Sequence, residues 1–238
     1  MKYKIVKIRS SQTVFRQRTI IIIYSGDTRG MLQDTLGSLV PFNFMKVMEH
    51  IPELSEIEVE LTVISFPKPI DSSNVSIEVW QELGYIIYKN YDQYDGFVIL
   101  HGTDTMACFA SALSFMLEGL AKPIIFTGAQ IPIGMLRSDA RENFITSIEI
   151  AANQRNGRLL IKEVCIYFNL RLFRGNCLQK MRSSTFADFD SQNYPLLAKS
   201  GIDISYNEAA LAIPNGLLPL RLHKDFDDNV AVLKIPWH

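Results

Sequence analysis

The sequence predicts an α/β protein in which helices flank a parallel β-sheet. Two observations carry this prediction. Short apolar segments of strand length alternate with segments whose apolar residues recur at helical spacing, and polar residues follow most of the predicted strands. Such alternation is typical of βαβ units with right-handed crossovers. A chain of 238 residues suffices for one large domain, or for one domain and a part of another.

The clearest strand is Thr19–Tyr24, a run of five β-branched residues followed by a tyrosine. It leads into the polar turn Ser25–Gly30, where two glycines flank Thr28 and let the backbone bend tightly beside a ligand. A hydroxyl group at the carboxyl end of a buried strand lies where open α/β sheets bind their ligands. The turn could also be a connector without chemistry. A phosphate site is disfavoured, because the GxGxxG and P-loop patterns are missing and Asp27 would repel an anion.

The first eighteen residues carry basic side chains and no acidic ones. In Lys2–Ile8 these charges alternate partly with apolar residues, a pattern that predicts an edge strand. No apolar region follows the charges before Thr19, so we do not expect a signal peptide.

The remaining elements follow from periodicity and from turn residues. A loop is expected over Met31–Pro41, and Ser73 or Asn74 is expected to cap the second helix. Asp139 and Glu142 have the spacing of a capping box before the last helix. Further strands are predicted at Ile57–Ser65, Gly96–Leu100, Pro123–Phe126 and Val164–Phe168. Helices are predicted from Phe42 to Ile51, through Val79–Ile87, through Ala107–Leu120 and from Ala140 to Asn153.

Regular patterns fade between Met181 and Asp227, which indicates a packed tail or a linker. A new strand is then predicted at Asn229–Ile235.

Composition excludes several classes of protein. The net charge of −1 and the pI of about 6.4 give no general attraction to nucleic acid or to an acidic membrane. The three cysteines lack metal-site spacing and suggest reduced thiols in the cytoplasm. The four histidines are scattered, so a zinc site is not expected. No apolar run is long enough to span a membrane.

The polar segments that follow the predicted strands are expected to meet at one edge of the sheet. They would bring Thr28, Ser72, Thr103–Asp104 and the stretch Arg174–Lys180 into one crevice. A threonine needs a neighbouring base to act as a nucleophile. A lysine shielded from water beside a carboxylate, such as Lys180 near Asp104, could supply that base. Two simpler interpretations stay open: a helix N-cap for Thr103–Asp104, and a solvated surface charge for Lys180.

Several motifs, taken together and in order, resemble the type I (cytoplasmic) L-asparaginases over about Thr19–Ile235. They are Tyr24–Met31, Asp71–Ser73, His101–Thr105 (HGTDT), Thr127–Gln130, Arg137–Asn143 and Arg174–Asn176. The resemblance implies a flavodoxin-like amino-terminal domain followed by a second, smaller α/β domain of which only the start is present. It divides the chain into a basic edge-strand extension (1–18), a catalytic domain (19–210), and a linker with the first strand of the second domain (211–238).

The resemblance also implies a threonine-dependent amidohydrolase that releases ammonia from L-asparagine through an acyl-enzyme, without metal or cofactor. The implied catalytic residues are Thr28 as the nucleophile, Thr103, Asp104, which also holds the substrate ammonium, and Lys180. The implied substrate-binding groups are Ser72 at the α-carboxylate, the adjacent Ser73, and backbone amides near Gly102 and Ala129. The partner is a small molecule, with no nucleic acid and no membrane. A dimer or tetramer is expected when the second domain is present.

The chain departs from the family pattern at Asp27 and Arg29, which flank Thr28, and in the loop Leu36–Pro41, which has no tyrosine. Two alternative functions therefore stay open. One is an inactive homologue that binds asparagine, aspartate or a full-length partner without turnover. The other is an amidase acting on glutamine or glutamyl-tRNA, for which the near-neutral charge offers no tRNA-binding surface.

Overall fold

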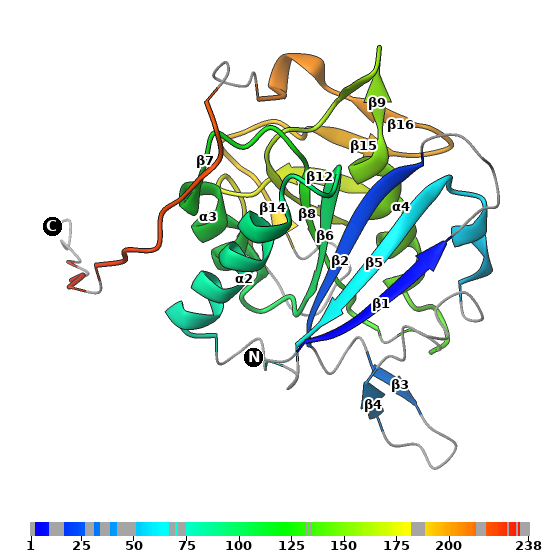
Figure 1. Cartoon of the computed structure of the whole chain (residues 1–238), viewed down its shortest axis with the longest axis horizontal. Helices are drawn as coiled ribbons and strands as arrows, with labels where there is room; N and C mark the ends of the chain where they lie inside the picture. The colour runs from blue at the N-terminus through cyan, green and yellow to red at the C-terminus, as the bar shows by residue number, and fades with distance from the viewer. Residues whose placement is uncertain are drawn as a thin grey trace, which may run out of the picture.

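The computed structural model describes residues 3–9, 17–26, 31–33, 39–41, 51–66, 70, 75–131, 133, 135–181, 189–212, 218–227, 229–231 and 233. Its main feature is a nine-stranded mixed sheet (Figure 1). In spatial order the strands are β1 (Lys4–Arg9), β5 (Val59–Ser65), β2 (Arg18–Gly26), β6 (Gly96–His101), β8 (Ile124–Thr127), β11 (Val164–Phe168), β12 (Arg171–Arg174), β15 (Ala198–Ser200) and β16 (Ile204–Tyr206). The helices are α2 (Ile77–Asn90), α3 (Met106–Met116) and α4 (Ala140–Ala152), with 3-10 turns η3 (Pro52–Ser55) and η5 (Glu208–Ala210).

The five central strands, β5, β2, β6, β8 and β11, are all parallel to one another. Numbered along the chain, their spatial order is 2-1-3-4-5, the order of flavodoxin-like sheets. The predicted fold class is therefore confirmed. In such a sheet the strand order reverses between the first and third strands, here β2 and β6, and ligands bind outside the carboxyl ends at that point.

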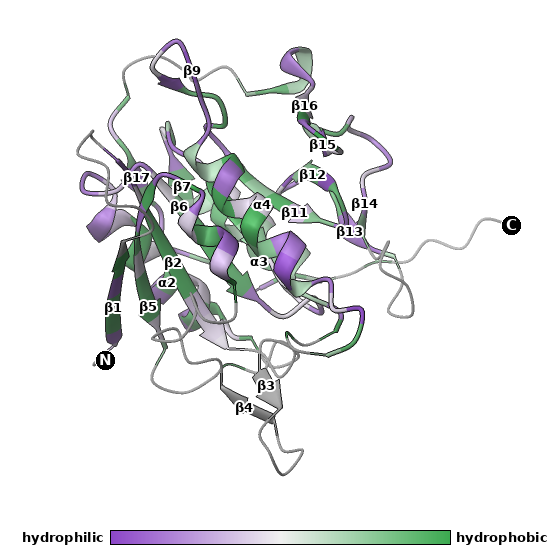
Figure 2. Cartoon of the chain, turned by 90° about the vertical axis from the view of Figure 1, so that its right-hand side faces the viewer, coloured by the Kyte–Doolittle hydropathy of each residue, from purple (hydrophilic) through white to green (hydrophobic). Residues whose placement is uncertain are grey.

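Helices cover both faces of the sheet, and the isoleucines of β2 divide between them (Figure 1). Ile20 and Ile22 pack toward α4, whereas Ile21 and Ile23 pack toward α2 and α3. All four are at most 1% exposed. Burying each one contributes roughly 1.5–3 kcal/mol, which explains why this run lies at the centre. In Figure 2 the central strands are coloured hydrophobic over most of their length, while the helices carry both colours.

Antiparallel strands extend the parallel core at both ends. β1 pairs with β5 from Lys4↔Ser65 to Arg9↔Glu60, which confirms the predicted basic edge strand. At the opposite end β12, β15 and β16 form antiparallel pairs. Among the described residues, no helix is long and apolar enough to cross a membrane.

Other predictions of local structure need correction. The predicted loop Met31–Pro41 contains the hairpin strands β3 (Met31–Gln33) and β4 (Leu39–Pro41). α2 begins after Ser76, three residues beyond Ser73. The proposed caps Ser73 and Asn74 and most of the predicted helix Phe42–Ile51 lie outside the described residues.

Long-range pairing accounts for further differences. α3 ends at Met116 rather than near Leu120, because β7 (Leu117–Glu118) pairs with β17 (Arg221–Leu222). Of these two strands, β17 lies within the region Met181–Asp227, where the sequence shows little regularity. The predicted strand Asn229–Ile235 is wrong for the residues that the structure describes there, 229–231 and 233, which form no strand. Two further pairs are β9 (Gln154–Arg155) with β10 (Arg158–Leu159), and β13 (Gln179–Lys180) with β14 (Phe189–Asp190).

Candidate active site

The carboxyl ends of β2 and β6 lie together with described residues that follow β5 and β8, at one edge of the sheet. Gly26 at the end of β2 lies opposite His101 at the end of β6. After β5, the Ile70 N–H donates a hydrogen bond of 2.9 Å to the Ser25 carbonyl. After β8, Gly128 packs so tightly on β6 that a Cβ atom there would lie 2.4 Å from the His101 carbonyl oxygen.

Lys180 reaches this edge and contacts two predicted catalytic residues. Its Nζ donates hydrogen bonds of 2.8 Å to Thr103 Oγ1 and of 2.8 Å to Asp104 Oδ1. Thr103 is 1% exposed, and the Lys180 side chain is 13% exposed. The Asp104 side chain remains 46% exposed, so a ligand can reach it from solvent. This cluster can therefore pass a proton between an amine and a hydroxyl group and can attract a cationic ligand group.

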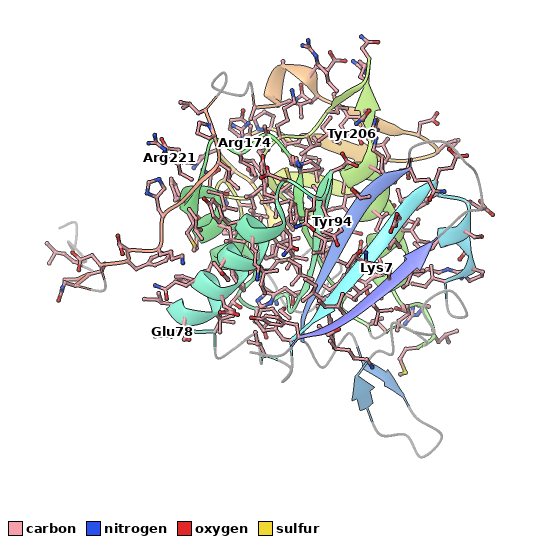
Figure 3. All side chains as sticks on the ribbon, in the orientation of Figure 1. Lys7, Glu78, Tyr94, Arg174, Tyr206 and Arg221 are labelled. Atoms are coloured by element: carbon pink, nitrogen blue, oxygen red, sulfur yellow. The ribbon has the colours of Figure 1, made fainter. Side chains whose placement is uncertain are left out.

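The sequence predicts the whole stretch Arg174–Lys180 in the crevice. This is wrong for Arg174, which lies outside it. β12 runs antiparallel to β11 and places Arg174 opposite Cys165, at the amino edge of the parallel strands. Figure 3 shows Arg174 near the top, whereas Glu78, at the start of α2, lies near the bottom. Gly175 then packs on Ser114, close to the end of α3, and Lys180 contacts residues just before its start. The chain thus returns along α3 from one sheet edge to the other.

Arg174 instead holds structure together at the amino edge. Its guanidinium group forms a two-pronged ion pair with Glu163 and donates a 3.0 Å hydrogen bond to the Ala210 carbonyl. The Glu163 carboxylate also accepts a hydrogen bond of 2.8 Å from the Ala212 N–H. The Arg174–Glu163 pair thereby holds the segment 210–212 against the amino edge of the sheet.

His101 is a residue of the site to which the sequence interpretation gave no separate role. It is 1% exposed, and its Nδ1 lies 2.8 Å from Ser25 Oγ while its Nε2 lies 3.1 Å from Thr105 Oγ1. The imidazole therefore joins the end of β2 to the start of α3. The rings of Phe109 and Phe126 stand edge-on to it. Burial lowers the pKa of His101 to about 4, so the ring is neutral at physiological pH.

This buried histidine predicts a pH dependence of stability. A histidine is protonated in the unfolded chain below about pH 6.5, whereas in the folded chain its pKa is about 4. Its contribution is complete above the unfolded pKa and is lost as the pH falls toward the folded pKa. We expect about 3 kcal/mol of the free energy of unfolding to be lost between pH 7.5 and pH 4 through this group.

Urea unfolding at several pH values, compared with the variant His101→Asn, measures this contribution. The variant is less stable at neutral pH but should lose about 3 kcal/mol less than the original chain over the same range. Equal losses in the two proteins would contradict a neutral, buried His101.

The other predicted site residues divide into two groups. Thr28, Ser72 and Ser73 lie outside the described residues, so their roles stay predictions. Gly102 is buried directly after His101, and Ala129, which is 5% exposed, follows Gly128 in the turn after β8. In the part of the chain that the structure covers, no group of three or more His, Cys, Asp or Glu side chains could hold a metal ion.

Comparison with known proteins agrees with this geometry. The family profile described as "Asparaginase, N-terminal" matches residues 19–212. The chain belongs to the asparaginase family. L-asparaginase 1 of Escherichia coli K12 is 42% identical over 222 residues, which are 92% of this chain and 64% of that protein. The mouse 60 kDa lysophospholipase is 36% identical over 242 residues, which are 92% of this chain and 42% of that protein.

Solved structures show the same fold. The crystal structure of L-asparaginase I from Vibrio cholerae superposes with a TM-score of 0.75 at 39% sequence identity, covering 87% of this chain and 61% of that one. The chain thus spans less than two thirds of the length of each of these asparaginase-family relatives.

Proposed function

We propose that this chain is an L-asparaginase-type amidohydrolase, which converts L-asparagine and water to L-aspartate and ammonia with Thr28 as the nucleophile. The observation that carries the proposal is the contact of Lys180 with both Thr103 and Asp104. Lys180 is far from Thr103 and Asp104 in the sequence, yet it meets them just beyond the carboxyl end of β6, one of the two strands between which the strand order reverses. The membership in the asparaginase family and the names of the relatives support the same reaction.

In the first half of the proposed reaction, Thr28 Oγ bonds to the side-chain amide carbon of asparagine. The carbonyl oxygen becomes an oxyanion, which peptide N–H groups near Gly102 and Ala129 stabilise. The carbon–nitrogen bond then breaks. Thr103 and Lys180 pass a proton to the leaving nitrogen and recover the proton that Thr28 releases, so ammonia departs and an aspartyl ester of Thr28 remains.

In the second half, a water oxygen bonds to the ester carbon and the bond to Thr28 Oγ breaks. The same cluster takes a proton from the water and returns one to Thr28, so aspartate leaves and the enzyme is restored. Asp104 holds the α-ammonium group by charge, and Ser72 with Ser73 hold the α-carboxylate. The half-exposed Asp104 carboxylate suits this role, since its other face lies against Lys180.

Ammonia release from several substrates tests the proposal. We expect turnover of L-asparagine that exceeds turnover of L-glutamine by about 10- to 200-fold, the discrimination that one methylene group allows. Glutamyl-tRNA and a lysophospholipid complete the panel, the latter because a lysophospholipase is among the relatives. Neither carries a carboxamide, so the release of glutamate and of fatty acid is measured for these two instead of ammonia. Calorimetric binding of aspartate without any turnover would select the alternative of an inactive binding protein.

We further propose that the protein is cytoplasmic and acts on a small molecule, with no nucleic acid or membrane as partner. A homodimer or homotetramer is proposed for the protein with its second domain present. The cysteines support a reducing compartment, since Cys108, Cys165 and Cys177 are all unpaired thiols.

A further inference from the structure

The side chain of Asp139, at the start of α4, binds the turn after β8 and does not cap its own helix. Asp139 stands at the N-cap position, but its side chain makes no capping hydrogen bond, so the predicted capping box with Glu142 is wrong. Its carboxylate instead accepts hydrogen bonds of 3.0 Å from the Gln130 N–H and of 2.9 Å from the Ile131 N–H. The helix start is completed by Ser138, whose hydroxyl oxygen accepts from the Ala140 N–H at 3.1 Å.

Asn143, one turn further along α4, completes this hold on the turn. It is 2% exposed and lies on the face of α4 that packs on the sheet. Its amide nitrogen donates to the Gly128 carbonyl at 3.0 Å and to the Asp139 carboxylate at 3.2 Å. Its amide oxygen accepts from the Asn169 N–H, just beyond β11, at 3.2 Å. A buried amide group that makes all these hydrogen bonds is held in one orientation, and it restricts the motion of the groups that it binds.

The turn held in this way, Gly128–Ile131, is pressed against the candidate active site. Gly128 packs directly on the carbonyl group of His101. Gly102 and Thr103 follow His101 in the sequence. Ala129 is therefore enclosed by residues whose backbone groups are fixed on both sides. Gly128 O is bound by Asn143, while the N–H groups of Gln130 and Ile131 are bound by Asp139.

We propose that Asp139 and Asn143 are positioning residues for the amidohydrolase reaction, holding the Ala129 peptide at the distance that the oxyanion requires. This inference rests on the proposed function, because it needs a reaction that develops negative charge on a carbonyl oxygen. A fixed N–H donor stabilises that charge without reorganisation, and a displacement of about 1 Å can reduce the rate by about 10²-fold. The Asp139 carboxylate holds this turn firmly, because it accepts from two successive N–H groups. Charge-assisted hydrogen bonds of this kind are about twice as strong as neutral ones.

The decisive experiment compares Asp139→Asn with Glu142→Gln in the full chain. Both changes remove one negative charge from the first turn of α4 and keep the size of the side chain. The Asp139 carboxylate accepts hydrogen bonds from the turn, whereas the Glu142 carboxylate accepts one from Thr146 on its own helix. Hydrogen exchange of the Gln130 and Ile131 amides reports on the turn, and kcat and KM for L-asparagine report on the reaction.

In Asp139→Asn we expect exchange at Gln130 and Ile131 to be at least about 10-fold faster and kcat to fall about 10- to 100-fold. KM should change less than about 3-fold, because the oxyanion exists only in the transition state. Glu142→Gln should match the original chain in every measurement. Unchanged exchange, or faster exchange with unchanged kcat, would overturn the proposal, as would an equal loss in both variants.

Two further measurements keep the test decisive. If Asp139→Asn does not fold, Ser138→Ala removes the 2.9 Å hydrogen bond from the Ser138 hydroxyl to the Ile131 carbonyl and should shift exchange and kcat in the same directions. If the original chain releases no ammonia, the proposed function fails before any variant is compared. In that case the exchange rates alone decide whether Asp139 holds the turn.

Discussion

The Thr28→Ala variant should release ammonia from L-asparagine at least about 10³-fold more slowly than the unaltered chain. Alanine removes the hydroxyl group that would carry the acyl intermediate, so the proposed route has no first step. The variant should still fold and should still bind aspartate, because the groups assigned to the α-carboxylate and α-ammonium are untouched. A coupled assay for ammonia measures the rate, and calorimetry measures the binding.

Thr28→Ser provides the matched control, since it keeps the hydroxyl group and loses only a methyl group. We expect this variant to retain measurable turnover. Turnover by Thr28→Ala close to that of the original chain would remove Thr28 from the mechanism.

The Lys180→Met variant should lower kcat by about 10²- to 10⁴-fold, the usual contribution of a general acid–base group. Methionine fills a similar space but carries no proton, and it leaves Thr103 and Asp104 without the amine that joins them. Arginine should not restore the rate, because its guanidinium group cannot release a proton in a protein. Steady-state kinetics give kcat, and urea unfolding shows that the variant is folded.

Lys199→Met is the control for this change. Lys199 lies exposed on β15, an antiparallel strand that lies beyond β12 in the sheet. It should leave kcat unchanged. A kcat of Lys180→Met within about 3-fold of the original would show that the Lys180 cluster is structural and not part of the reaction.

The parallel core could be predicted from the sequence because most of its strands are short apolar runs buried on both faces, and β5 alternates between apolar and polar residues. The run Ile20–Ile23 and the segment Phe97–Ile99 admit few other interpretations, whereas the flavodoxin-like strand order followed from the resemblance to the L-asparaginases. The polar residues at the strand ends predict a site at that edge. Of these, Thr103 and Asp104 do meet Lys180, whereas Thr28 and Ser72 lie outside the described residues.

What the sequence could not predict depends on pairing between distant segments or on the direction of a strand. β7 exists because Arg221–Leu222 lies beside it, and Arg174 lies at the far edge because β12 reverses direction after Phe168. Asp139 has the local pattern of a helix cap, and only the packed structure shows that its carboxylate binds Gln130 and Ile131. Asn143, a polar residue on the buried face of α4, was the available signal of a further role.

The order of strands in the sheet also has a consequence for synthesis of the chain. β2 ends at Gly26, but its two neighbours begin only at Val59 and Gly96. A ribosome therefore exposes four consecutive isoleucines well before either partner strand has emerged. Pairing over such long separations is slow and leaves hydrophobic surface exposed in the meantime. We therefore expect nascent chains of this protein to need chaperones more than a helical bundle of equal length would.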